Sequence, residues 1–213
     1  RTPARAALSL PTRAAAEAIA AEWAAQGEFI DPASMPMTRL VNSAIDGVSR
    51  AMAETAAEVV KFAGSDLVCY RAGEPDKLAI AQAQAWNPAL DFARDKLGAR
   101  LVLAEGVMFV AQPEEALAAV SRAVEAIADA GMAGPLRLAA LNVMTSLTGS
   151  AVLALAVAQG AMSAEEAWRA AHVDEDFQIQ AWGADAEAAE RRERRWLDMQ
   201  AAARLCALAI DSD

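Results

Sequence analysis

The chain has 213 residues, of which 55% are hydrophobic and only 5% aromatic, and its formal net charge is −10. This length accommodates one large or two small domains, and the apolar fraction is sufficient for a substantial buried core. Because such an acidic surface repels phosphate backbones, the composition argues against a nucleic-acid-binding protein. Alanine, the residue with the highest helix propensity, dominates many segments, so a mostly helical protein is expected.

The first sixty residues begin with a short alternating segment and continue with helical patterns. Residues 6–10 alternate loosely, which is typical of an edge strand or of the end of a strand begun upstream. A helix is predicted over residues 12–27, and because Trp23 shares a stripe with Ile19, we expect Trp23 to be buried in the core. Apolar residues at spacings of three and four predict a second, long helix over residues 38–64.

Two β-rich segments lie in the middle of the chain. Residues 66–71 are expected to be extended, and residues 101–111 have strand composition on both sides of Glu105 and Gly106, which suggests a hairpin. Between these segments, Pro88 is expected to divide a helical stretch into two helices, because the residue before a proline resists helical geometry.

The most apolar run, residues 136–160, is long enough to raise the question of a membrane span. Polar residues such as Asn142 and Thr145 interrupt it, and no basic cluster flanks it. We therefore expect a buried helix of a soluble bundle. A membrane-associated protein is the competing hypothesis for this run.

The C-terminal third contains clear helix signals. Ser163 followed by Glu166 forms a capping-box pattern, which predicts the start of a helix. The last helix is predicted over residues 185–210, with apolar residues at spacings of three and four. Cys206 lies on this apolar stripe, so we expect it to be a buried structural residue with a reduced thiol.

The chain lacks the sequence motifs of the common nucleotide-binding and catalytic sites. No GxxxxGK[ST] loop, GxGxxG loop or GxSxG elbow occurs. Because His172 is the only histidine, an HExxH zinc site is excluded. One cluster still suggests chemistry, since His172 stands two residues before Asp174, Glu175 and Asp176.

This cluster has two interpretations. On a helix, three consecutive carboxylates fan over about 200° and do not converge on one cation. A small metal-dependent or acid/base enzyme centred on His172 and Asp174–Asp176 is therefore the alternative hypothesis. Asp174, Gln178 and Trp182 are spaced by four residues and share a helical face, which offers charge, hydrogen bonds and apolar area together. From the residues alone, this face is either a partner-binding surface or a structural feature.

The segment DEDFQIQAWG, residues 174–183, resembles the signature of the F-type ATP synthase assembly chaperones that act on the α subunit of the F1 sector. Other segments of this chain resemble the same family in order along nearly its whole length: residues 10–12, 22–23, 30–46, 66–71, 82–93, 147–160 and 164–168. Two departures stand out. By this resemblance, we expect the chain to begin inside the N-terminal part that members carry, and His172 occupies a position where members more often have arginine.

The resemblance implies a mostly α (α+β) fold, with a small, N-terminally trimmed α/β part over residues 1–62 and a larger helical bundle domain over residues 63–213. It implies an ATP-independent chaperone rather than an enzyme, with no cofactor or metal. Such a chaperone binds the unassembled α subunit of F1-ATPase, prevents its aggregation and promotes assembly of the α/β hexamer.

The resemblance also implies where the partner binds. The expected partner-binding residues are Asp174, Glu175, Asp176, Gln178 and Trp182. We expect a monomer without nucleic-acid partners or a membrane span. Its expected location is the cytoplasm of a bacterium or, for a eukaryotic protein, the mitochondrial matrix.

Overall fold

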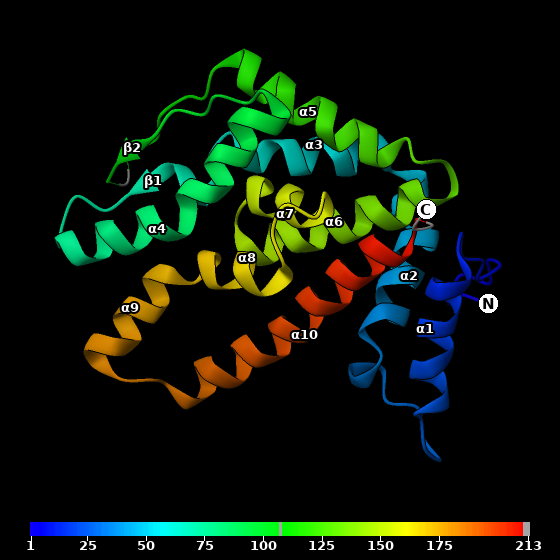
Figure 1. The fold of residues 1–213 in the computed structure, drawn as a ribbon. Coiled ribbons are helices and arrows are strands. Elements are labelled where there is room, and N and C mark those ends of the chain that lie inside the picture. The colour runs from blue at the N-terminus through cyan, green and yellow to red at the C-terminus, as the bar shows by residue number, and fades with distance from the viewer. Residues whose placement is uncertain (107, 211–213) are drawn as a thin grey trace.

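A computed structural model describes residues 1–106 and 108–210, and this part of the chain is mostly α-helical, as predicted (Figure 1). Its α-helices are α1 (Arg13–Ala24), α2 (Pro36–Asp46), α3 (Met52–Ala63), α4 (Asp76–Phe92), α5 (Glu114–Ala128), α6 (Gly134–Thr148), α7 (Ala151–Ala158), α8 (Ala164–Ala171), α9 (Val173–Trp182) and α10 (Ala186–Leu208). Its strands are β1 (Tyr70–Arg71) and β2 (Ala104–Glu105).

Helices α6 and α7 form the centre of the molecule. Helix α7 is apolar on all sides, and residues 151–156 are all buried, as expected for a helix enclosed by others. Helix α6 packs against α2, α3, α5 and α10, which surround it in Figure 1. The core that results is continuous, because it joins Val41 of α2 and Val59 of α3 to Leu205 of α10.

The apolar run over residues 136–160 forms two helices rather than one. Gly149, with φ +68°, ends α6, and the Ser150 side chain caps α7 by accepting a 3.0 Å hydrogen bond from the Leu153 N–H. Buried Asp66 adds a second acceptor for α7, 3.1 Å from the Val152 N–H. Within residues 1–106 and 108–210, no helix is both long and apolar enough to cross a membrane.

The two strands pair differently from the prediction. Strands β1 and β2 run parallel, with Tyr70 opposite Ala104 and Arg71 opposite Glu105. The hairpin expected over residues 101–111 is therefore wrong, because β2 pairs with a strand more than thirty positions earlier instead of with its own neighbour. Residue 107, at the centre of that hairpin, lies outside the described residues.

The strand expected over residues 6–10 is also wrong, because these residues form no regular element. The residues just before them are held by Asp46 of α2, whose carboxylate accepts a 2.6 Å bond from the Thr2 hydroxyl and a 3.0 Å bond from the Ala4 N–H. Every regular element between residues 1 and 62 is helical, so the α/β character expected for this part is not observed.

Two predicted helix boundaries also differ from the structure. Pro88 lies inside α4 instead of dividing it, because Trp86 and Ala89 are buried on either side and keep the helix packed. The long helix expected over residues 38–64 is interrupted after α2, where the Gly47 N–H bonds the Ser43 carbonyl at 2.9 Å.

Trp23 is 46% exposed, so its predicted place in the core is wrong. The buried residues of α1 are Ala15, Ala18 and Ile19, all nearer the N-terminus of the helix. Trp23 lies in the last turn of α1, where the adjacent Glu22 accepts hydrogen bonds from the Met37 and Thr38 N–H groups of α2. Cys206 of α10 is buried and carries a free thiol.

Candidate functional site

Helix α9 contains the predicted partner-binding residues and is packed less than its neighbours. It follows α8, which begins at the predicted capping box: the Ser163 hydroxyl accepts from the Glu166 N–H, and the Glu166 carboxylate accepts from the Ser163 N–H. None of the residues in α9 is buried. Figure 1 shows α9 at the outer end of the bundle, where a short loop connects it to α10.

His172 forms the junction between α8 and α9. Its Nδ1 donates a 2.7 Å hydrogen bond to the Trp168 carbonyl, and its ring lies 4.0 Å from the Trp168 ring, centroid to centroid. Burial lowers the pKa of His172 below its ordinary value, and the nearby positive charge of Arg192 acts in the same direction. The imidazole is therefore neutral at neutral pH, and it anchors α9 to α8.

The three consecutive carboxylates of α9 have three different partners. Asp174 accepts a 2.7 Å hydrogen bond from the side-chain amide of Gln82 on α4. Glu175 lies 3.9 Å from His172 Nε2. Asp176 forms an ion pair with Arg192 of α10. The carboxylates diverge as the helical pitch predicts, and within residues 1–106 and 108–210 no three candidate ligands gather around a possible metal position.

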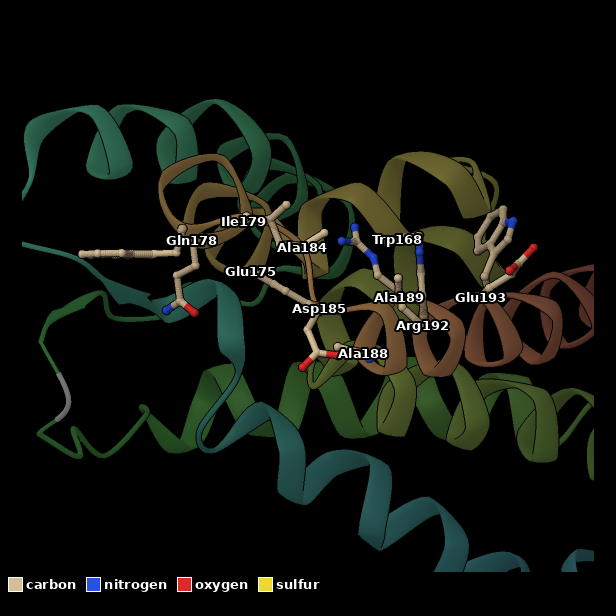
Figure 2. Close-up of a pocket in the computed structure, with 13 residues that line it drawn as sticks. Trp168, Glu175, Gln178, Ile179, Ala184, Asp185, Ala188, Ala189, Arg192 and Glu193 are labelled. Carbon is tan, nitrogen blue, oxygen red and sulfur yellow. Dashed lines mark hydrogen bonds between the residues drawn. The ribbon is translucent and has the colours of Figure 1, made fainter.

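A groove of about 520 Å³, which we call the α9–α10 groove, lies between these two helices (Figure 2). Figure 2 shows Glu175 and Ile179 of α9 on one side and Ala189 and Arg192 of α10 on the other. Its lining is predominantly apolar. The lining residues are Trp168, Glu175, Gln178, Ile179, Trp182, Gly183, Ala184, Asp185, Ala188, Ala189, Arg192, Glu193 and Trp196.

The residues that the sequence placed on one face of α9 do not all line the same groove. Glu175, Gln178 and Trp182 line the α9–α10 groove, whereas Asp174 does not line it and contacts α4. Trp182 is 89% exposed and precedes Gly183, whose φ is +91°. Its side chain is therefore not part of the hydrophobic core.

A second groove of about 560 Å³, the α4–α9 groove, lies on another side of α9. Ala81, Ala85 and Pro88 of α4 form one wall, and Phe177 of α9 contributes to the other. Asp176 also lines this groove. Helix α9 therefore has an open groove on each of two sides.

Several residues of the site were not identified from the sequence. Gln82 and Arg192 hold α9 in place, but each is distant in sequence from its partner, and no local pattern marks the pairing. Trp168 and Trp196, whose ring centroids are 5.5 Å apart, form the aromatic floor of the α9–α10 groove. The spacing of Trp196 on α10 indicated only a packing seam.

Comparisons with known proteins place the chain in a family. The sequence profile of the ATP12 chaperone protein matches residues 1–94. The structure is similar to that of the Atu1473 protein from Agrobacterium tumefaciens, with 46% sequence identity and a TM-score of 0.91, covering 98% of this chain and 76% of that one.

It is also similar to Atp12 from Paracoccus denitrificans, with 38% identity and a TM-score of 0.91, covering 99% of this chain and 88% of that one. A solved aspartate-to-lysine variant of the Paracoccus protein matches with the same identity and TM-score and is covered over 87% of its length. These relatives are matched over nearly the whole of the present chain, at an identity that unrelated proteins with the same fold do not reach. The chain therefore belongs to the ATP12 chaperone protein family.

Proposed function

We propose that this chaperone binds the unassembled α subunit of F1-ATPase through α9, prevents its aggregation and promotes assembly of the α/β hexamer. The observation that carries the proposal is the exposure of α9. This helix buries none of its residues, has a groove on two sides and presents Trp182 at 89% exposure. Exposed apolar surface rimmed by polar residues is typical of protein-binding sites.

The partner-binding residues we propose are Asp174, Glu175, Asp176, Gln178 and Trp182. An exposed indole provides a large contact area at a small cost in conformational entropy, and tryptophan is enriched at binding hot spots. The polar side chains next to it supply hydrogen bonds and charge. Because the three carboxylates have different local partners, we propose that the binding surface is the whole of α9 and not one cluster of carboxylates.

Release of the partner in this mechanism requires no ATP hydrolysis. An unassembled α subunit exposes the apolar surface that it later buries against β, and such a patch is prone to aggregation. The chaperone covers this surface until β binds it more tightly, since the outcome depends on the difference between two affinities. We propose that the protein acts as a monomer, in the bacterial cytoplasm or the mitochondrial matrix.

Co-expression with the α subunit tests this function. We expect the chaperone to form a complex with α and to keep α in the soluble fraction. Trp182→Ala should weaken the complex, whereas Trp23→Ala, which removes an exposed tryptophan from the distant helix α1, should not. Absence of a complex together with undiminished α aggregation would refute the proposed function.

A further inference from the structure

The α9–α10 groove combines aromatic side chains with two carboxylates that form no close ion pair with an arginine or lysine of the described residues. Trp168 and Trp196 line the groove, and Trp168 also packs against the His172 ring at a tilt of 47°. Three alanines, Ala184, Ala188 and Ala189, contribute short side chains that leave the groove open. The groove can therefore hold the apolar part of a side chain from another molecule.

The positive charge of the groove is already used within the protein. Arg192, a lining residue, forms an ion pair with Asp176 of α9. The Arg192 side chain is largely buried, with only 22% of its area exposed. An incoming carboxylate would have to compete with Asp176, so the groove is poorly suited to an anionic partner.

Two of the lining carboxylates, by contrast, form no close ion pair with an arginine or lysine of the described residues, although Arg192 acts on Glu175 at longer range. Glu193 makes no ion pair within 4.0 Å in the described part of the chain, and the only such neighbour of Glu175 is His172, which is neutral at neutral pH. The third lining carboxylate, Asp185, is occupied in capping α10 through the Glu187 and Ala188 N–H groups. Figure 2 shows Glu175 on α9 and Glu193 on α10, with Arg192 between them.

We infer that the α9–α10 groove binds a segment of the unassembled α subunit that carries arginine or lysine beside an apolar side chain. The inference rests on the proposed function and specifies the chemistry of the segment. The aliphatic stem of the basic residue packs over the partly exposed Trp196, where its cation also gains from the indole face. Glu175 and Glu193 supply the complementary charge, and the net charge of −10 favours the same type of partner.

Binding of purified α subunit at increasing NaCl concentration tests this inference. The double variant Glu175→Gln and Glu193→Gln keeps the size of both side chains and removes their charge. Its affinity for α should be lower by about threefold to thirtyfold at low salt, and should depend less on salt than that of the wild type. A control double variant, Glu28→Gln and Glu58→Gln, makes the same change in net charge at exposed positions outside the groove and should bind like the wild type.

A photo-crosslinker identifies the occupant directly. A benzophenone side chain at Ala189, an exposed lining residue, should crosslink α, and mass spectrometry of the product should show a segment that contains arginine or lysine next to apolar residues. The same group at Ala57 of α3, outside the groove, should give no specific product. A crosslinked segment without a basic residue would contradict the inferred chemistry.

The outcomes separate this inference from the function on which it rests. If wild-type protein does not bind α, the proposed function fails. If wild-type protein binds α and the Glu175 and Glu193 double variant binds with the same affinity and salt dependence, the function stands and the inference about the groove is wrong.

Discussion

The carboxylate of Asp174 on α9 and the side-chain amide of Gln82 on α4 are joined by a 2.7 Å hydrogen bond across 92 positions of sequence. The same Gln82 accepts a 2.8 Å hydrogen bond from the Ala72 N–H, just after β1. Gln82 is 2% exposed, so it links α9 to the body of the protein from a buried position. The buried Gln82 amide is thus one of the contacts that orient the proposed partner-binding helix, together with Arg192 and His172.

Replacement of Asp174 by lysine should abolish α binding while the protein remains folded. The lysine cannot accept the Gln82 bond, and it reverses a charge on the proposed partner surface. Because no residue of α9 is buried, the hydrophobic core should remain intact. The measurements are rescue of ATP synthase assembly and the thermal midpoint. Asp174→Asn, which retains an acceptor oxygen, serves as the control for loss of charge alone, and full rescue by Asp174→Lys at normal expression would refute the role of this residue.

The ion pair between Asp176 and Arg192 should affect the position of α9 more than global stability. Both side chains are partly exposed, so Asp176→Asn should reduce the free energy of unfolding by about 1 kcal/mol or less. Hydrogen exchange should become faster across α9 and remain unchanged in α7, which is enclosed by the core. Equal acceleration in both helices would indicate a global effect instead.

Two tryptophans should differ widely in their contribution to stability. Trp86 is 1% exposed and its Nε1 donates a 2.7 Å bond to the Ala170 carbonyl, so Trp86→Ala should cost about 3–5 kcal/mol. Trp23 is about half exposed, so Trp23→Ala should cost about 1 kcal/mol or less. Urea denaturation of the two variants provides the comparison, and a loss of several kcal/mol for Trp23→Ala would show that this residue packs more tightly than its exposure indicates.

Asp66 should make the protein more stable in mild acid. Burial raises the pKa of Asp66 from its ordinary value of 3.8 to about 6, although the Ser150 side chain and the Val152 and Val68 N–H groups favour the carboxylate. A carboxyl with a raised pKa in the folded state contributes stability below its unfolded pKa, and this contribution disappears as the pH rises through the folded pKa. The contribution of Asp66 should therefore decrease by about 3 kcal/mol between about pH 4 and about pH 6.

Denaturation of the wild type and of Asp66→Asn across this pH range isolates that contribution. The variant should lack the decrease, because an amide of the same size does not titrate. Identical pH profiles for the two proteins would show that Asp66 does not titrate in this range.

His172 should have the opposite pH dependence. Its folded pKa is below the ordinary value of 6.5, so the unfolded chain takes up a proton first as the pH falls. The groups that face it are Arg192 and Arg195, which oppose protonation, and Glu175, which favours it. His172→Gln, which can still donate to the Trp168 carbonyl, should lose less stability than the wild type as the pH falls below 6.5. If the variant lost stability more steeply than the wild type in acid, the lowered pKa of His172 would be contradicted.

The helical nature of the fold could be predicted because it depends on local patterns. Alanine content, the Ser163–Glu166 cap and the apolar spacing of α10 each act within a few residues of one another. The strand errors have a common physical origin. The pairing of β1 with β2 and the bonds of Thr2 and Ala4 to Asp46 are contacts between distant segments, which short-range alternation cannot reveal.

The candidate site was predictable to a similar extent. Helical pitch correctly indicated that Asp174, Glu175 and Asp176 diverge, because it depends only on residue spacing. The grooves could not be predicted, since their walls come from α4, α8 and α10 and depend on how these helices pack. Trp23 illustrates the same limit, because a stripe on one helix does not show which of its residues the neighbouring helices cover.

Because the core is continuous, the segment matched by the family profile depends on the rest of the chain. Residues 1–94 contain α1 to α4, but the core that covers them also requires α6, α7 and α10. This segment expressed alone should not fold, and the intact chain should unfold in a single calorimetric transition. Destabilising substitutions in α2 should then lower the population of binding-competent molecules even though they lie far from α9, so loss of chaperone activity in a genetic screen should map across the entire core.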